Sequence, residues 1–224
     1  MGRSVLWIFA AWIAGCSPQA ALLASAVPDG TMSVLLSQTQ RVADSNRRRI
    51  VELEQARDWQ GLVRFAEDNI KRDPNTPDWW LVAGYAHTQQ SQHMRAAECY
   101  MEAVRMEPDA RLAWSLLAES YRAAGQPQRA ANALSNALLA RRDDVQLHWL
   151  MGETQSDMRR WQPAVSAYKD ALRADPEYLP AWRGLKRAYG ELGRAQEARE
   201  ADGMVSRLSA EQAAKTKAAT QQKQ

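Results

Sequence analysis

Few side chains of this 224-residue sequence have the chemistry of a catalytic or metal site. The sequence contains three His and two Cys, namely His87, His93, His148, Cys16 and Cys99. A zinc site needs His, Cys or carboxylate ligands grouped at short spacing, and none of these five residues lies in such a group. We therefore predict no metal site, structural roles for the three histidines and an inert thiol at Cys99.

Sequence patterns typical of enzymes are missing as well. The sequence has no glycine-rich phosphate loop, no Gly-x-Ser-x-Gly elbow and no His-Glu-x-x-His motif. A catalytic pair of carboxylates would need a shared cleft that shifts their pKa values, but the pattern places the carboxylates at helix starts and on exposed helix faces. We predict no catalytic residue and no cofactor, and an enzyme is the function class that the sequence supports least.

The composition favours a helical interaction protein. A hydrophobic fraction of 46% and a charged fraction of 25% are ordinary globular values and exclude disorder of the whole chain. Lys+Arg 29 against Asp+Glu 26 gives a net charge of +3, which is too small to indicate a nucleic-acid partner. Nine Trp stand against two Phe, and Ala and Arg, which favour helix, are frequent.

Cys16 differs from Cys99 because of the segment that precedes it. Arg3 is followed by an apolar run at 5–15, which is too short to span a bilayer but has the length of a signal-peptide core. The run leads into Ile-Ala-Gly-Cys at 13–16. This motif resembles the lipobox of bacterial lipoproteins, in which the Cys becomes the lipidated first residue of the mature chain. The resemblance implies a signal peptide at 1–15 and an acyl anchor, such as palmitate, on Cys16.

The resemblance also implies a place in the cell. Ser17 after the Cys is similar to the class that is sorted to the outer membrane, so we expect a protein anchored there by its lipid and facing the periplasm. The alternative is an ordinary secretory signal cut after Ala26, where Ala-Ser-Ala at 24–26 has the A-x-A arrangement. That cleavage would leave a soluble periplasmic protein.

A period of 34 residues organises the rest of the chain. It connects Trp80, Trp114, His148 and Trp182; Ala96, Ala130, Ala164 and Ala198; Ala103, Ala137 and Ala171; and Pro74, Pro108 and Pro176. These columns resemble the tetratricopeptide repeat (TPR), a unit of two antiparallel helices, A and B, with an aromatic residue early in helix A and a closing Pro. The resemblance implies an all-α, right-handed solenoid of about five helix pairs.

The period also sets the expected boundaries. The segments are a lipidated tether with an extra helix at 16–42, a degenerate unit at 43–76, units at 77–110, 111–144 and 145–178, a capping unit at 179–212, and a disordered tail at 213–224. The array thus covers 43–212. In the capping unit Lys186 replaces a small residue and Asp202 an aromatic one, which gives the polar outer face that a terminal repeat needs.

Helix A residues that packing does not use would line a concave groove. Proteins of this family hold a segment of another protein in that groove. The predicted groove residues are Leu81, Tyr85, Gln89, Glu119, Arg122, Trp149, Glu153, Arg183 and Arg187. Tyr85, Trp149 and Arg183 are the predicted anchors, since Trp, Tyr and Arg often dominate interface energies. The alternative for Trp149 is simple packing between neighbouring helices.

These features favour a scaffold that binds protein or peptide segments. By its resemblance to TPR lipoproteins, we expect it to assist the assembly of an envelope machine such as a pilus or a secretion system. The alternative is an adaptor that recruits envelope enzymes, such as peptidoglycan hydrolases or proteases, or that assists outer-membrane protein biogenesis. The sequence leaves the partner and the oligomeric state open.

Overall fold

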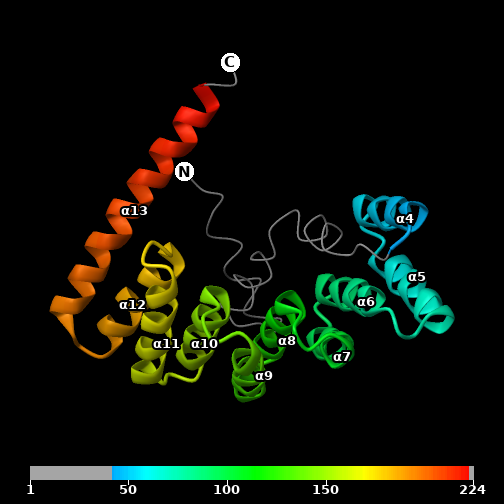
Figure 1. Ribbon diagram of the computed structural model, residues 1–224, viewed down its shortest axis with the longest axis horizontal. Coiled ribbons are helices and arrows are strands. Elements are labelled where there is room, and N and C mark those ends of the chain that lie inside the picture. The colour runs from blue at the N-terminus through cyan, green and yellow to red at the C-terminus, as the bar shows by residue number, and fades with distance from the viewer. Residues whose placement is uncertain (1–41, 222–224) are drawn as a thin grey trace, which may run out of the picture. The chain divides into compact units, whose positions relative to one another are not determined.

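The computed structural model describes residues 42–221, and this part of the chain consists of ten α-helices without strands (Figure 1). Cys16, the predicted signal peptide at 1–15 and nearly all of the predicted tether at 16–42 lie outside the described residues. Within the described part, no helix is both long enough and apolar enough to cross a bilayer.

The helices belong to two compact units, Met1–Met106 and Glu107–Gln224. The described helices of unit 1 are α4 (Asp44–Gln55), α5 (Trp59–Arg72), α6 (Pro77–Gln89) and α7 (His93–Met106). Those of unit 2 are α8 (Arg111–Ala123), α9 (Pro127–Ala140), α10 (Val145–Asp157), α11 (Trp161–Ala174), α12 (Leu179–Glu191) and α13 (Ala195–Gln221). One helix pair begins in each predicted 34-residue segment, and the predicted all-α architecture of helical hairpins is confirmed.

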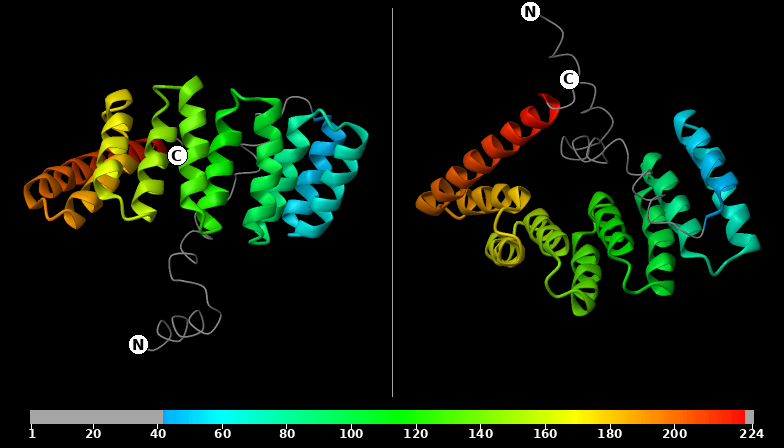
Figure 2. Two further views of the ribbon diagram at one scale, coloured as in Figure 1. Left: turned by 90° about the horizontal axis from the view of Figure 1, so that it is seen from below. Right: turned by 45° about the horizontal axis from the view of Figure 1, so that its top comes forward.

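Neighbouring helices in each unit pack in chain order (Figure 2). In unit 2 the first helices of successive pairs, α8, α10 and α12, also contact one another. Their side chains therefore form one continuous row of three helices, which positions the candidate site described below.

A left-handed residue closes the turn inside every described helix pair. The φ angles are 52° at Arg57, 58° at Ser91, 71° at Gly125, 55° at Arg159 and 70° at Gly193. These positions lie 34 residues apart, so the turn belongs to the same period as the packing columns. Glycine adopts this conformation without the steric cost that other residues meet.

Small residues let the two helices of a pair approach closely. A Cβ atom added to Gly84 would lie 2.5 Å from Tyr100, and one added to Gly152 would lie 2.4 Å from Tyr168. Tyr100 and Tyr168 are 1% and 0% exposed, so each pair buries a complete aromatic ring against a glycine. Both units share this packing.

The last pair, α12 and α13, carries polar residues in the same columns. Lys186 follows Gly152 by one repeat, and Asp202 follows Tyr168. Lys186 Nζ donates to Asp202 Oδ1 over 2.7 Å, and both side chains are about half exposed. The last helix pair thus carries a solvated ion pair at the two positions where helices α10 and α11 bury the ring of Tyr168 against Gly152.

The Trp column has a recurrent hydrogen bond that explains its spacing. In each case the ring nitrogen lies near the backbone carbonyl oxygen six residues earlier. The distances are 3.4 Å from Trp80 to Pro74, 2.7 Å from Trp114 to Pro108, 2.6 Å from His148 to Arg142, and 2.8 Å from Trp182 to Pro176. Since a carbonyl only accepts, Nε2 of His148 donates. His148 thus replaces Trp in a structural role.

The C-terminal segment differs from the sequence prediction. Residues 213–224 were expected to be disordered, but α13 continues to Gln221. Side chains at 211–217 are all exposed, in agreement with the missing apolar stripe. The segment is rich in Ala, Lys and Gln, which have high helix propensities, and this intrinsic preference accounts for the helix without tertiary support.

Candidate partner-binding surface

The predicted groove residues of unit 1 lie on α6, and two of them are buried. Leu81 and Tyr85 are 8% and 5% exposed, while Gln89 is partly exposed. The Tyr85 hydroxyl donates to Glu54 Oε1 over 2.8 Å, and its ring meets Trp59 edge to face with centroids 6.0 Å apart. The prediction of Tyr85 as a ligand anchor is therefore corrected, because α4 and α5 occupy both its hydroxyl and its ring.

In unit 2 the predicted groove residues do come together on one surface. We call it the A face; it consists of Glu119, Arg122, Trp149, Glu153, Asp157, Arg183 and Arg187. Helix positions three or four residues apart share a face, so each of α8, α10 and α12 presents its members of this set on one side.

Charged side chains link the three helices of the A face. Arg122 Nε donates to Asp157 Oδ2 over 2.6 Å, and Arg122 Nη2 lies 3.9 Å from Glu153 Oε2. Arg187 Nη2 donates to Glu153 Oε1 over 2.6 Å. Glu153 on α10 is thus paired with one arginine from α8 and another from α12.

The same charges reach into the core through Tyr168. The Tyr168 hydroxyl donates to Glu153 Oε1 over 2.6 Å and lies 3.0 Å from both Ser156 Oγ and Arg187 Nη2. Burial, together with the negative charge of Glu153, raises the pKa of Tyr168. Burial acts against the charge of Arg187, but Glu153 and Tyr168 outweigh it and raise the Arg187 pKa. This cluster fixes the positions of the charged side chains that link α8, α10 and α12.

Trp149 lies on the middle helix of the A face. Its ring meets Tyr178 edge to face with centroids 6.3 Å apart, and it packs against the core around Tyr168. It nevertheless remains partly exposed. One side of the ring thus packs between helices, as the alternative interpretation expects, and the rest of the ring is accessible; its role as an anchor stays a prediction.

Glu119 and Arg183 are the two charged residues of the A face outside the ion pairs around Glu153. Within the described residues neither forms a hydrogen bond or an ion pair through its side chain. Burial raises the pKa of Glu119, and the positive charge of Arg122, one turn along α8, opposes this shift. Arg183 on α12 is exposed.

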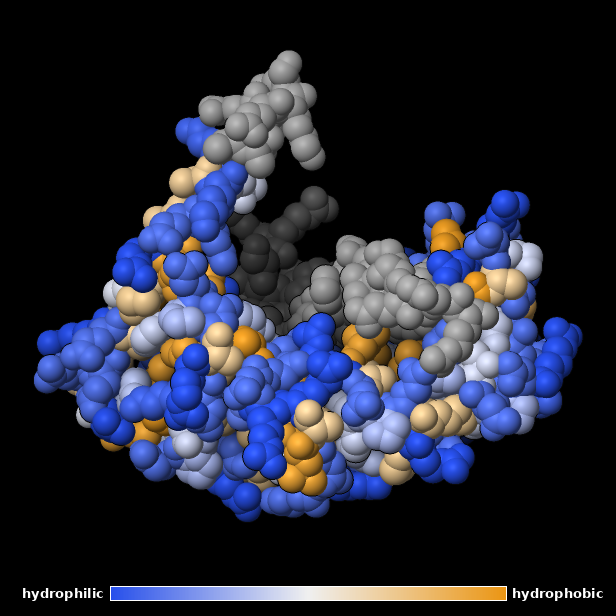
Figure 3. All heavy atoms as spheres, viewed as in Figure 1, coloured by the Kyte–Doolittle hydropathy of each residue, from blue (hydrophilic) through white to orange (hydrophobic). Residues whose placement is uncertain are grey.

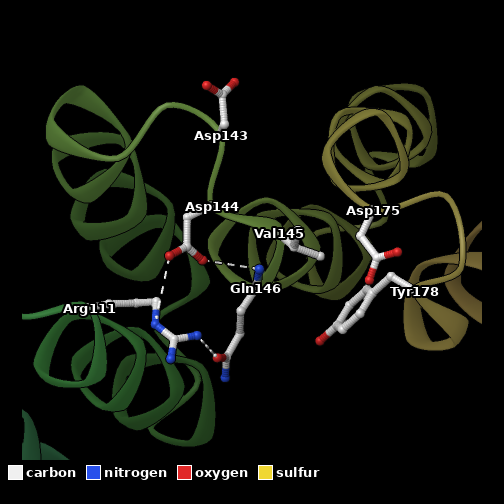
Figure 4. Close-up of a pocket in the computed structure, with 7 residues that line it drawn as sticks. All are labelled: Arg111, Asp143, Asp144, Val145, Gln146, Asp175 and Tyr178. Atoms are coloured by element: carbon white, nitrogen blue, oxygen red, sulfur yellow. Dashed lines mark hydrogen bonds and ion pairs between the residues drawn. The ribbon is translucent and has the colours of Figure 1, made fainter.

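A polar pocket of about 400 Å³ lies beside the A face, at the starts of the first helices. Arg111 donates to Gln146 Oε1 over 2.7 Å and lies 3.7 Å from Asp144, while Asp143 points away from them (Figure 4). Tyr178 faces this pair from the other side. The sequence analysis did not predict this pocket. The feature that could have predicted it is the spacing of 35 residues, which places Arg111 opposite Gln146 on a neighbouring helix.

The pocket carboxylates serve the backbone. Asp144 accepts from the amides of Gln146 and Leu147 at the start of α10, and Asp175 accepts from the amide of Glu177. Figure 3 shows a mainly hydrophilic face with hydrophobic residues in small separate patches. The pocket in unit 2 is lined mainly by polar and charged side chains.

His87 lies on α6, and His93 and Cys99 lie on α7. His87 Nδ1 lies 2.8 Å from Gln92 Oε1, and burial lowers the pKa of His93. Burial, with smaller contributions from nearby glutamates, raises the pKa of the Cys99 thiol to about 12, which makes it a poor nucleophile. Within residues 42–221 no group of three or more His, Cys, Asp or Glu side chains is placed to hold a metal ion.

Comparisons with known proteins concern the repeat and its fold. Residues 81–145 match the tetratricopeptide repeat family. Superkiller complex protein 3 of Mus musculus is 25% identical over 115 residues, which are 51% of this chain and 7% of that protein. The chain spans only about a tenth of the length of the curated relatives that it matches.

Solved structures show the fold. MamA superposes with a TM-score of 0.67 at 19% identity, over 77% of this chain and 98% of that chain. PilW, described as a type IV pilus biogenesis factor, gives 0.61 at 17% identity over 75% and 79%. YrrB, described as a TPR protein with an unusual peptide-binding site, gives 0.58 at 14% identity over 80% and 92%. The chain thus has a TPR-like fold of helical hairpins.

Proposed function

We propose that this protein is an envelope scaffold that holds segments of partner proteins on the A face of unit 2. The observation that carries the proposal is the row of α8, α10 and α12, where a fixed ionic cluster around Glu153 lies one helix turn from a partly exposed ring, Trp149. Rigid, partly apolar side chains beside fixed charges are what a protein-binding surface needs. The likeness to YrrB, whose structure is described by its peptide-binding site, supports this class of function.

The proposed pathway is the assembly of a pilus or a secretion system in a bacterial envelope. Its support is the likeness of fold to PilW, a pilus biogenesis factor. A pull-down from envelope extract would compare the unaltered protein with Trp149→Ala. Leu139→Ala is the matched control, because Leu139 is 74% exposed on α9, away from the A face.

We expect Trp149→Ala to lose its partners and Leu139→Ala to keep them, with equal helicity by circular dichroism. Captured pilus or secretion components would support the assembly role. Peptidoglycan hydrolases or proteases would instead establish the adaptor role. Equal capture by both variants would contradict binding through the A face.

The proposal places the protein on the outer membrane, facing the periplasm, through an acyl chain on Cys16. Its support is the Ile-Ala-Gly-Cys motif at 13–16. Several acyl chains, at about 0.8 kcal/mol per buried methylene, would make the anchor practically permanent. Mass spectrometry of membrane fractions should find an acylated N-terminal Cys16, and Cys16→Ala should abolish the acyl mass. A chain that begins at Val27 without lipid would contradict the anchor.

A further inference from the structure

The A face carries three different chemistries on three successive helices. Glu119 on α8 is a partly buried carboxylate, Trp149 on α10 is a partly exposed ring, and Arg183 on α12 is an exposed cation. The remaining charges of the A face are paired with one another by Arg122 and Arg187. A ligand on this surface therefore meets one acid, one aromatic ring and one base that are free to bind it.

Helix packing fixes the distance over which a ligand would meet them. Packed helix axes lie about 8–10 Å apart, and α8, α10 and α12 contact one another in that order. The axes of α8 and α12, which carry Glu119 and Arg183, are thus separated by roughly 20 Å. An extended chain rises about 3.3 Å per residue, so about six residues span this distance.

We propose that the A face binds an extended peptide segment with a Lys or Arg side chain at Glu119, an apolar or aromatic side chain at Trp149, and an acidic side chain at Arg183. The proposal rests on the proposed function, since it specifies the partner of the same surface. Charge complementarity sets the register and direction of such a segment.

The environment of Glu119 favours a cationic group there. A desolvated carboxylate without a partner is costly, and an opposite charge nearby stabilises its ionised form. Arg122 stabilises this charge only in part, because its guanidinium is paired with Asp157 and Glu153. Arg183 is solvated, so its pair with an acidic side chain contributes less than the Glu119 pair.

A display selection tests the register. The full chain, purified in mild detergent, would be immobilised and exposed to a random dodecapeptide library on phage. We expect enriched peptides to carry Lys or Arg and Asp or Glu about six residues apart, with apolar or aromatic residues between them. Enrichment of peptides without this pattern, or of none at all, would overturn the proposal.

Double-mutant cycles then assign each charge. Glu119→Gln and the replacement of the peptide Lys or Arg by Gln should each weaken binding about 10-fold, without a further loss when combined. Arg183→Gln and the replacement of the acidic residue of the peptide should each weaken binding about 3-fold, again without a further loss when combined. Asp170→Asn and Arg173→Gln, an ion pair on α11 away from the A face, are matched controls that should leave the affinity unchanged.

The outcomes separate this inference from the proposed function. If Trp149→Ala weakens binding but the charge substitutions act additively, the A face binds peptides and the charge register is wrong. If enriched peptides are indifferent to Glu119→Gln, Arg183→Gln and Trp149→Ala alike, both the register and the proposed function are wrong.

Discussion

One repeat column has different chemistry in the two units. Tyr85, Glu119, Glu153 and Arg187 follow one another at 34-residue spacing. In unit 1 this position is buried, since Tyr85 is only 5% exposed. In unit 2 it carries two acids and one base of the A face. The repeat therefore fixes the packing of each pair but leaves this helix surface free to differ.

The packing that the two units share should respond most strongly to substitution. Gly152→Ala should destabilise unit 2 by about 2–3 kcal/mol, because the added Cβ would lie 2.4 Å from the buried Tyr168 ring. Gly84→Ala should have a similar effect in unit 1, where the distance to Tyr100 is 2.5 Å. Chemical denaturation followed by circular dichroism measures both losses.

Gly190→Ala is the matched control for these substitutions. Gly190 lies in α12, and a Cβ added there would meet no atom within 4 Å. Helix propensity predicts a gain of up to about 1 kcal/mol. A loss at Gly190 as large as that at Gly152 would show that the close contact with Tyr168 is not the cause.

The next prediction concerns the difference between the units. Tyr85→Phe removes the hydroxyl that donates to Glu54 and should destabilise unit 1 by about 1–2 kcal/mol, because it leaves a carboxylate without its donor. Partner binding should remain unchanged, since Tyr85 is buried. The measurements are denaturation and the pull-down used for Trp149→Ala.

A loss of partners by folded Tyr85→Phe would contradict this contrast and restore Tyr85 to the binding surface. Glu54→Gln keeps an acceptor for the hydroxyl and serves as a control. It should cost less than Tyr85→Phe.

The sequence predicted the architecture well because the period of 34 residues records packing directly. The Trp residues recur because each ring donates a hydrogen bond to the preceding loop. Gly152 and Tyr168 stand at their positions because the paired helices contact each other there. It failed for Tyr85 because its partner Glu54 lies 31 residues away on α4, in the least regular repeat. It also could not show which charges of the A face pair, because rotamers and helix spacing decide that Glu153 forms ion pairs with Arg122 and Arg187 while Glu119 stays outside them.

The left-handed position in the turn of each helix pair predicts a smaller effect, which stabilises the fold. Arg159 has φ 55°, where Gly125 and Gly193 stand in two other turns. Arg159→Gly should relieve backbone strain and stabilise unit 2 by roughly 0.5–1 kcal/mol, a net value after the entropy that glycine adds to the unfolded chain. Gly125→Ala should introduce such strain and destabilise unit 2. Thermal unfolding measures both, and destabilisation by Arg159→Gly would show that its side chain contributes more than the strain costs.

The smallest effect is expected at the end of the packing columns, between Lys186 and Asp202. Asp202→Asn removes their ion pair, in which both side chains are about half exposed. Exposed pairs contribute about 0–1 kcal/mol and are screened by salt, so the change in unfolding free energy should be below about 0.5 kcal/mol and vanish at 1 M NaCl. Denaturation at low and high salt measures it. A loss comparable to that of Gly152→Ala would mean that this pair supports the packing of α12 on α13, as the buried ring of Tyr168 does between α10 and α11. A small, salt-sensitive loss is what a solvated terminal face requires, because its role is to keep the last helix pair from presenting an apolar surface.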